Sequence, residues 1–314
     1  MKHVFVLANP EAGRGRGASA RDAAIARLRE LDVRVTVRTG SSTAETRLFA
    51  SEAVATRPDV LVIVGGDGTL AIVLDVLVGT GIPLVLVPAG TGNDLARALG
   101  IPFGSAESAA VAVSAAAHGV PRALDVGEAV CPDGTALFLT VAALGFDAKV
   151  SERTNTHRWP RGRARYYLAM IIELIRLKPM AFALRAEGVD SPLSHGTLIA
   201  VGNTRSYGGG MPVCPLADPH DGVFDVVHIA PVGRMKLIRL LPRLLRGTHV
   251  QLPEVTTLRA AEVEVSAPGL VVYADGERVG SESVRIVTLS GALQILLPPI
   301  DDDQADSATR KAHR

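Results

Sequence analysis

The chain has 314 residues, 47% of them hydrophobic, and a formal net charge of +1. This length favours two domains with a sizeable core, and the near-neutral charge argues against a nucleic-acid-binding protein. We interpret the two cysteines, Cys131 and Cys214, as buried thiols in a reducing cytosol rather than as a disulfide.

We find no segment that resembles a secretion signal or a membrane span. The apolar run Val4–Ala8 is too short for a signal, and no run reaches the roughly 18 residues of a transmembrane helix. Residues 301–314 lack apolar periodicity and are predicted to be a disordered tail. We therefore expect a cytoplasmic protein.

Residues 1–124 alternate between short apolar runs and segments of helical periodicity. The continuous apolar run Val60–Val64 is typical of a parallel strand that is buried on both faces. The predicted strands are Val4–Ala8, Val33–Val37, Val60–Val64 and Leu84–Val87, and the predicted helices are one capped by Ser19, Thr43–Thr56 and Ala71–Val78. This alternation predicts a doubly wound α/β domain.

After Ala123 the apolar runs become shorter and richer in β-branched residues. The predicted strands are Ala136–Val141, Leu198–Val201, Val223–Ile229, Val263–Val265, Leu270–Tyr273 and Val284–Leu289, and the predicted helices are Tyr166–Leu177 and Met235–Leu245. Residues 125–300 are therefore predicted to form an antiparallel β-rich domain. A last strand, Leu293–Leu297, fits either domain.

Three loops after strands of the first domain are rich in glycine. The first loop, Asn9–Gly17, precedes a helix, and its glycines let backbone N–H groups approach phosphate. It lacks the Lys-Ser/Thr ending of a Walker A loop, so a plain strand-to-helix turn explains it equally well.

The second and third loops are Gly65–Thr69 and Pro88–Asp94, each directly after a predicted strand. Ligands bind at the carboxyl ends of strands in open α/β sheets, and Asp67 can hold Mg²⁺ directly or through water. The alternative for Gly65–Thr69 is a turn closed by a hydrogen bond of the Asp67 side chain. Three such loops in succession favour a phosphate site.

The Gly-Gly-Asp-Gly-Thr run, followed about twenty residues later by Pro-Ala-Gly-Thr-Gly-Asn-Asp, resembles the diacylglycerol kinase catalytic domain. That family includes sphingosine, ceramide and bacterial lipid kinases. Further motifs extend the resemblance over residues 4–297: Gly145–Ala148, Gly202-Asn203, Tyr207–Met211, Pro215–Asp225 and Asp275–Glu277.

The resemblance implies an N-terminal α/β nucleotide-binding domain, a C-terminal β-sandwich that receives the lipid, and an active site between them. It implies an ATP- and Mg²⁺-dependent lipid kinase of phospholipid biosynthesis, with diacylglycerol as the default acceptor. The implied ATP-site residues are Asn9, Pro10, Glu11, Ala12, Gly13, Thr39, Gly65, Gly66, Asp67, Gly68, Thr69, Leu70, Thr91, Asn93 and Asp94.

The resemblance also implies catalytic roles for three acidic residues. Asp67 would organise the catalytic Mg²⁺, and Glu277 would accept the proton of the lipid hydroxyl, with Asp275 in the same network. From the residues alone, Asp275–Glu277 is instead a hairpin turn. A structural Mg²⁺ would be bound by Asp218, Asp221 and Val223.

One departure from the family occurs directly after Leu70. The family continues with Asn-Glu, where this chain has Ala71 and Ile72, so any nucleotide or metal contact of that Glu is missing.

Two basic stretches are candidates for contact with a membrane surface. Residues 153–165 carry five arginines around Trp159, and residues 234–246 are basic and amphipathic. A solvated basic face over a core helix explains each stretch equally well. A homodimer is compatible with the sequence.

Two other functions remain as alternatives. An NAD-kinase-like or sugar kinase would share the Gly-Gly-Asp-Gly loop, and a non-catalytic nucleotide- or lipid-binding regulator would explain the change at Ala71 and Ile72.

Overall fold

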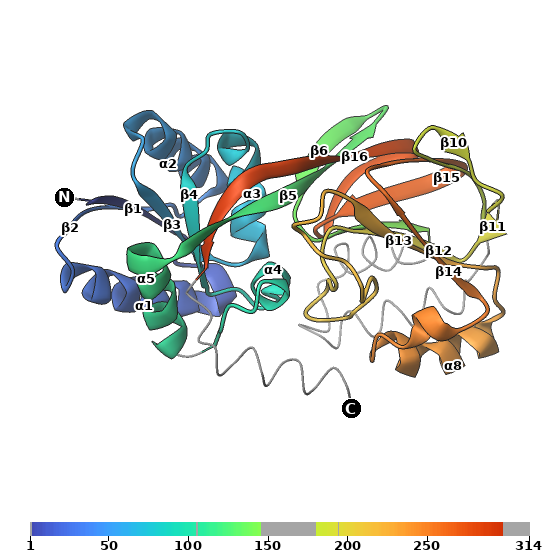
Figure 1. The fold of residues 1–314 in the computed structure, drawn as a ribbon, viewed down its shortest axis with the longest axis horizontal. Coiled ribbons are helices and arrows are strands. Elements are labelled where there is room, and N and C mark those ends of the chain that lie inside the picture. Colours follow the sequence, from blue (N-terminus) through green and yellow to red (C-terminus); the bar gives the residue numbers. More distant parts are fainter. Residues whose placement is uncertain (1, 105, 146–179, 194, 298–314) are drawn as a thin grey trace.

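The computed structural model describes residues 2–104, 106–145, 180–193 and 195–297. The chain forms two units side by side, joined by long strands that run through both (Figure 1). The arginine-rich stretch 153–165, the predicted helix Tyr166–Leu177 and the predicted tail 301–314 lie outside the described residues.

The N-terminal unit is a parallel sheet with the strand order β2-β1-β3-β4. All four predicted strands are confirmed, and the helix over Thr43–Thr56 has the predicted bounds, with the Ser42 side chain accepting from Glu45 N. The elements are β1 (Lys2–Ala8), α1 (Ala12–Arg29), β2 (Val33–Thr39), α2 (Thr43–Thr56), β3 (Val60–Gly65), α3 (Asp67–Leu77), β4 (Pro83–Pro88), α4 (Asp94–Ala98) and α5 (Ala106–His118).

Helices cover both faces of this sheet because alternate residues of each buried strand point to opposite sides. Phe5 and Leu7 of β1 pack in one core with α2 and α3, whereas Val4 and Val6 pack in another with α1 and α5. The doubly wound α/β fold is thereby confirmed.

Two helices begin earlier than predicted. Helix α1 opens with a turn at Ala12 and is kinked at Gly13, Arg14 and Gly15, which have positive φ, so its regular part begins after Gly15. The Ser19 hydroxyl donates to Arg16 O instead of capping the helix. Helix α3 starts at Asp67 because the backbone N–H groups of Thr69 and Leu70 already bond to Gly66 O. Asp67 therefore lies in the first turn of α3, directly after β3.

The C-terminal unit is built from antiparallel strand pairs, as predicted. Its elements, with β5 and β16 shared by both units, are β5 (Val120–Cys131), β6 (Gly134–Phe138), β7 (Val141–Gly145), β8 (Met180–Ala181), β9 (Ala183–Ala186), β10 (Val189–Asp190), β11 (His195–Gly196), β12 (Leu198–Gly202), β13 (Phe224–Ile229), α8 (Arg234–Leu244), a 3-10 turn (His249–Gln251), β14 (Val255–Ala260), β15 (Glu262–Ala274) and β16 (Glu277–Leu297).

Three strand predictions in this unit are corrected. The run Ala136–Val141 is divided between β6 and β7, with a break at Leu139 and Thr140. The runs Val263–Val265 and Leu270–Tyr273 belong to the single strand β15, which is irregular between Ser266 and Val271.

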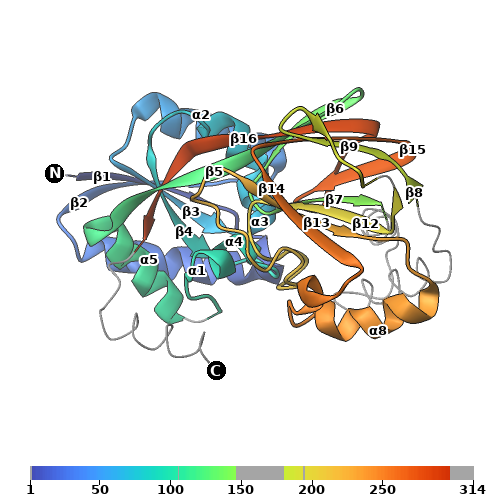
Figure 2. The same cartoon turned by 45° about the vertical axis from the view of Figure 1, so that its right-hand side comes forward.

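The final strand belongs to both units. Leu293–Leu297 is the end of the 21-residue strand β16, which also contains the run Val284–Leu289. This end pairs with β4 in parallel and with β5 in the antiparallel sense. The sheet of the N-terminal unit thus continues through β16 into the C-terminal unit (Figure 2).

Cys131 and Cys214 are both buried and are not joined in a disulfide, as predicted. Among the helices that the structure describes, none is long and apolar enough to cross a bilayer.

Candidate active site

The three glycine-rich loops meet at the carboxyl edge of the parallel sheet. Asn9 Nδ2 donates to Thr69 Oγ1 at 3.2 Å, which joins the first loop to the second. Arg16 Nη2 donates to Gly90 O at 2.8 Å, which joins the first loop to the third. A Cβ atom on Gly66 would lie 2.6 Å from Gly90 Cα, so the second and third loops need glycine at their contact.

The start of α3 leaves open space in front of the second loop. Gly68 is exposed, and apart from its chain neighbours and the backbone of its own helix no described atom lies within 4 Å of where its Cβ would be. No side chain caps this helix. Its unpaired N–H groups and the positive end of its dipole therefore face a space in which an anion can bind.

Ile72, one of the two residues that depart from the family pattern, is half-buried. Its side chain packs against the core between the sheet and helices α2 and α3, and its carbonyl accepts from Arg47 Nη1 at 3.0 Å. The departure has thus replaced a polar side chain by one that packs against the core.

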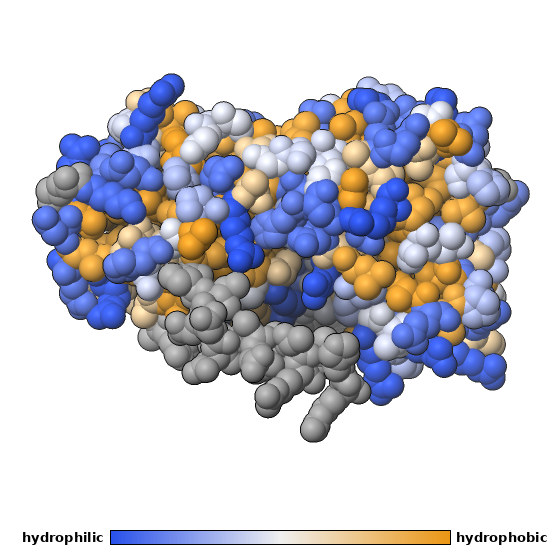
Figure 3. All heavy atoms as spheres, viewed as in Figure 1, coloured by the Kyte–Doolittle hydropathy of each residue, from blue (hydrophilic) through white to orange (hydrophobic). Residues whose placement is uncertain are grey.

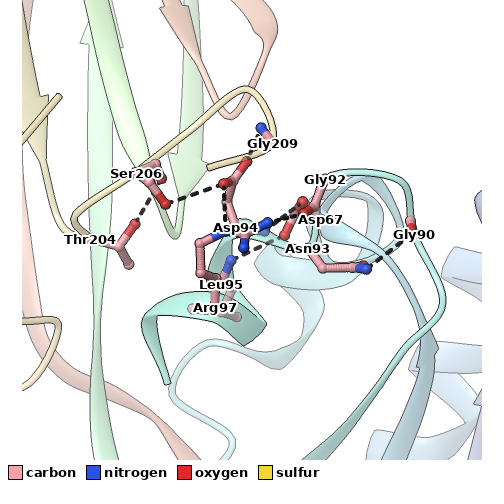
Figure 4. Close-up of polar contacts among 10 residues, drawn as sticks. All are labelled: Asp67, Gly90, Gly92, Asn93, Asp94, Leu95, Arg97, Thr204, Ser206 and Gly209. Carbon is pink, nitrogen blue, oxygen red and sulfur yellow. Dashed lines mark hydrogen bonds and ion pairs between the residues drawn. The ribbon is translucent and has the colours of Figure 1, made fainter. Parts of the chain in front are cut away.

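Asp67 lies beside the first turn of α4 (Figure 4). Its carboxylate accepts from the backbone of Asp94 at 3.1 Å and of Leu95 at 3.3 Å. Burial is the main cause that raises the pKa of Asp67 to about 6, and the negative charges of Asp94 and Asp275 add to the effect. The negative charge of Asp67 is therefore only partly compensated by the protein.

Asp94 connects the two units. The residue is only 5% exposed, and its side chain accepts from Ser206 Oγ at 3.2 Å and from Gly209 N at 2.7 Å (Figure 4). A Cβ on Gly92 would lie 3.0 Å from Asp67 Oδ2 and 3.9 Å from Gly209 Cα. Asp94, predicted as an ATP-site residue, thus has a carboxylate bonded to the C-terminal unit.

The other residues predicted for the ATP site occupy the edges of the three loops. Thr91 is exposed in the third loop, whereas Asn93 is buried with a left-handed backbone and donates to Gly90 O at 3.0 Å. Thr39 ends β2 and accepts from Arg21 at 3.4 Å. Glu11 N donates to Asn9 Oδ1 at 3.0 Å, which closes the turn over Pro10.

Asp275 and Gly276 form the two-residue turn between β15 and β16. Both have positive φ, 48° and 84°, and Asp-Gly is favoured in such hairpin turns. The hairpin expected from the residues alone is therefore correct for the backbone. The Asp275 carboxylate additionally accepts from Leu139 N and Thr140 N, both at 2.8 Å, and from the Thr140 hydroxyl.

Two consequences follow from the contacts of Asp275. The N–H groups of Leu139 and Thr140 bond to a carboxylate, which explains why β6 and β7 are separate strands. Burial raises the pKa of Asp275 above its usual value, although these hydrogen bonds oppose the shift. The side chain holds the turn against the β6–β7 junction.

Glu277 is the first residue of β16 and is exposed. Within the described part of the chain, no hydrogen bond or ion pair involves its side chain. Its carboxylate is therefore free to meet a substrate, in contrast to that of Asp275.

A buried polar centre, which was not predicted, links these elements. The Asn203 side chain, fully buried, donates to Asp125 O and Leu139 O, both at 2.9 Å. The Asp125 carboxylate accepts from Gly222 N and Gly291 N, both at 2.7 Å. Two signals were available: Gly202-Asn203 is one of the motifs of the family resemblance, and Asp125 stands among the apolar residues of the β5 segment.

The segment predicted as a Mg²⁺ loop is attached to this centre through Gly222. Asp221 accepts from Val223 N at 3.2 Å and forms an ion pair with Arg259 of β14, a residue that the sequence analysis missed. Burial raises the pKa of Asp225, whose Oδ2 atom is buried and lacks a hydrogen-bond partner. Arg259 Nε is 3.8 Å from that atom.

Comparison with known families and structures places the chain. Residues 3–129 match the diacylglycerol kinase catalytic domain, and residues 140–297 match the YegS C-terminal NAD kinase beta sandwich-like domain. The protein named diacylglycerol kinase in Mycobacterium tuberculosis is 43% identical over 296 residues, which cover 94% of this chain and 95% of that protein.

Two solved structures show the same fold. A diacylglycerol kinase structure from Bacillus anthracis superposes with a TM-score of 0.69 at 18% identity, covering 95% of this chain and 97% of that one. An NAD kinase from Archaeoglobus fulgidus superposes with a TM-score of 0.54 at 17% identity, covering 98% of each chain. The NAD kinase therefore shows a shared fold, whereas the high sequence identity is that to the protein from Mycobacterium tuberculosis named diacylglycerol kinase. The chain therefore belongs to the diacylglycerol kinase family of lipid kinases.

Proposed function

We propose that this kinase transfers the γ-phosphate of ATP to the hydroxyl of diacylglycerol. The observation that carries the proposal is the convergence of three glycine-rich loops on an open helix start beside the undercompensated carboxylate of Asp67. The 43% identical relative named diacylglycerol kinase supports the choice of acceptor.

The phosphates of ATP would lie over Gly68 at the start of α3, where backbone N–H groups point outward. Phosphoryl transfer depends on alignment of the reactants and on neutralisation of their charge, and a bound Mg²⁺ would supply much of the latter. Asp67 fits such an ion, because burial and two neighbouring carboxylates leave its charge undercompensated. Asp94 and Leu95 hold that carboxylate in place.

A second, structural Mg²⁺ at Asp218, Asp221 and Val223 fits the chemistry of that loop. The buried Asp225 Oδ2 atom without a partner, together with the neighbouring charges of Asp218 and Asp221, gives the loop an excess of carboxylate oxygen. Among the described residues no three acidic, His or Cys side chains converge on one point. Val223 would therefore contribute its carbonyl oxygen. The Asp221 carboxylate, which pairs with Arg259 in the structure, would bind the ion in place of Arg259.

Glu277 is the group that we assign as general base, because its carboxylate is exposed and that of Asp275 is occupied. We expect Glu277→Gln to lower kcat by roughly 10²–10⁴-fold, the usual contribution of general base catalysis. The melting temperature should not change, because the side chain has no partner among the described residues. Steady-state kinetics with diacylglycerol in detergent micelles measures the loss.

Glu282→Gln is the matched control, since Glu282 is also exposed and lies on the same strand. It should leave kcat unchanged. Near-normal turnover of Glu277→Gln would show that the base is another group.

Gly68 and Gly66 provide a test of the ATP site that separates binding from folding. We expect Gly68→Ala to raise stability by up to about 1 kcal/mol, because alanine favours a helix and meets no protein atom here. The new methyl group would occupy the space assigned to phosphate, so the Kd for ATP should rise at least about tenfold. Calorimetric titration and thermal unfolding measure both quantities.

Gly66→Ala should behave in the opposite way. Its Cβ would lie 2.6 Å from Gly90 Cα, so the loops must separate and stability should fall by roughly 1–3 kcal/mol. If ATP binds to Gly68→Ala with unchanged affinity, the phosphates do not lie over the start of α3.

Because the acceptor is a lipid, we propose that the protein is cytoplasmic and binds peripherally to the membrane surface. A panel of diacylglycerol, sphingosine, ceramide and NAD with radiolabelled ATP tests the acceptor. Phosphorylation of NAD without any lipid would overturn the proposal, whereas preference for another lipid would overturn only the choice of diacylglycerol.

A further inference from the structure

Helix α8 presents exposed apolar side chains to solvent. Met235 is 66% exposed, Ile238 47% and Leu245 45%, which is unusual for large hydrophobic residues so close in sequence. The opposite side of the helix is anchored, because Leu237, Leu240 and Leu244 are buried in the core of the C-terminal unit. The exposed residues are therefore not the packing face of the helix.

The exposed apolar residues form one strip, next to a strip of cations. At about 100° per residue, Ile238, Pro242 and Met235 cover roughly 60° of the helix circumference, and Arg239 and Arg243 follow directly beyond them. Leu245 and Arg246 are exposed directly after the end of the helix. In Figure 3, hydrophilic residues gather beside apolar ones at the lower right, where Figure 1 places α8.

The cations of this strip meet little opposing charge among the described residues: the pKa of Glu254 is lowered chiefly by its hydrogen bond from Lys236 and to a smaller extent by the charge of Arg243. Lys236 forms an ion pair with Glu254, but no described residue forms one with Arg239, Arg243 or Arg246. Residues 234–246 contain no acidic side chain. Cations beside exposed apolar groups match an anionic bilayer, into which the apolar side chains insert while the guanidinium groups stay at the headgroups.

A second copy of the chain fits this face less well. In a symmetric dimer that packs α8 against α8, the arginines of one chain would face the arginines of the other. Like charges that are brought together disfavour association. A bilayer supplies anionic groups and an apolar interior at the same time.

Helix α8 is also connected to the candidate active site. Its buried leucines share a core with Tyr207 and Cys214. These two residues flank Gly209, whose N–H donates to Asp94 at 2.7 Å. At its end, a Cβ on Gly247 would lie 3.2 Å from Pro215, next to Leu216, which is 67% exposed. A membrane that holds α8 would therefore hold the C-terminal side of the active site.

We propose that the outward face of α8 and of the two residues that follow it, formed by Met235, Ile238, Pro242 and Leu245 with Arg239, Arg243 and Arg246, docks the kinase on anionic bilayers. This inference rests on the proposed function, since a lipid acceptor requires the enzyme to reach a membrane surface.

The test is binding of the full chain to vesicles of phosphatidylcholine alone or with one quarter phosphatidylglycerol, measured by co-sedimentation. We expect Met235→Ser/Ile238→Ser to weaken binding to the anionic vesicles about tenfold or more, because two apolar side chains lose their insertion. Arg239→Gln/Arg243→Gln should weaken it by about tenfold to thirtyfold, with little effect on phosphatidylcholine alone.

Two control variants change the same chemistry on the N-terminal unit, away from α8 (Figure 2). Leu48→Ser removes a 63% exposed apolar residue of α2, and Arg29→Gln/Arg34→Gln removes two exposed cations. Both controls should bind anionic vesicles like the unaltered protein.

Kinase activity distinguishes this inference from the proposed function. The α8 variants should lose activity on vesicles and keep it on diacylglycerol in detergent micelles. If the unaltered protein fails to phosphorylate diacylglycerol in micelles, diacylglycerol is not its substrate. Vesicle binding is measured independently of that result. Vesicle binding that depends neither on anionic lipid nor on the α8 substitutions would overturn the docking face. It would also be overturned if the protein is a dimer that Met235→Ser/Ile238→Ser dissociates without changing vesicle binding.

Discussion

Asp67→Asn is expected to abolish most of the kinase activity and at the same time to stabilise the protein. Activity should fall by roughly 10²–10³-fold or more, because an amide cannot replace the charge that we assign to metal and phosphate binding. The stabilisation follows from the raised pKa of about 6, which shows that the folded protein disfavours the charged carboxylate.

The size of this stabilisation follows from two opposing effects. A shift from 3.8 to about 6 corresponds to about 3 kcal/mol at most. Partial exposure of Asp67 and the loss of a good acceptor for Asp94 N or Leu95 N reduce the gain, so we expect about 1 kcal/mol at pH 8. Urea unfolding of the two proteins measures the difference.

The pH dependence has a defined sign. The folded protein holds the Asp67 proton more tightly than the unfolded chain does, so the stability from this group is complete below pH 3.8 and is lost as pH rises through about 6. The advantage of Asp67→Asn should therefore appear above pH 6 and vanish near pH 4. In the unaltered enzyme, kcat/KM should rise with pH through about 6 as the carboxylate ionises.

Asp75→Asn is the control on the same helix. Its pKa is lowered, chiefly by the hydrogen bond from Arg47, so the charged form stabilises the fold and its removal should cost up to about 1 kcal/mol while activity stays normal. Asp67→Asn with full activity, or with lower stability at pH 8, would contradict the proposed role of the undercompensated charge.

Asp275→Ala is expected to be the most destabilising of these substitutions. It removes the acceptor for two backbone N–H groups and the Thr140 hydroxyl, and it places alanine at a φ of 48°. Unpaired buried donors cost about 1–3 kcal/mol each, and the left-handed backbone adds about 1 kcal/mol. Burial of the charged carboxylate offsets part of this, so we expect a net loss of about 2–4 kcal/mol in urea unfolding.

Two variants separate the contributions. Asp275→Asn keeps one acceptor oxygen and tolerates the left-handed backbone, so its loss should stay below about 2 kcal/mol. Glu277→Ala alters the next exposed residue of the hairpin and should leave stability unchanged. Equal stability of Asp275→Ala and the unaltered protein would mean that this carboxylate does not hold the hairpin against Leu139 and Thr140.

Much of the N-terminal unit was predictable because its signals are local. The apolar runs of β1 and β3 mark strands that are buried on both faces, and parallel strands bring their following loops to one edge of a sheet. The start of α3 was placed too late because glycines at Gly66 and Gly68 weaken helical periodicity, although the backbone there is already helical after Gly66.

The sequence by itself determined the α/β and β-rich architecture, the family resemblance and the segments that carry acidic residues, since these depend on short-range patterns. Only the tertiary structure decided how individual carboxylates are used. Asp275 bonds to Leu139 across 136 positions of sequence and Asp94 to Ser206 across 112, so their roles depend on contacts that no local pattern encodes. The length of β16 and the exposed face of α8 have the same physical origin, because each depends on which distant segments pack alongside.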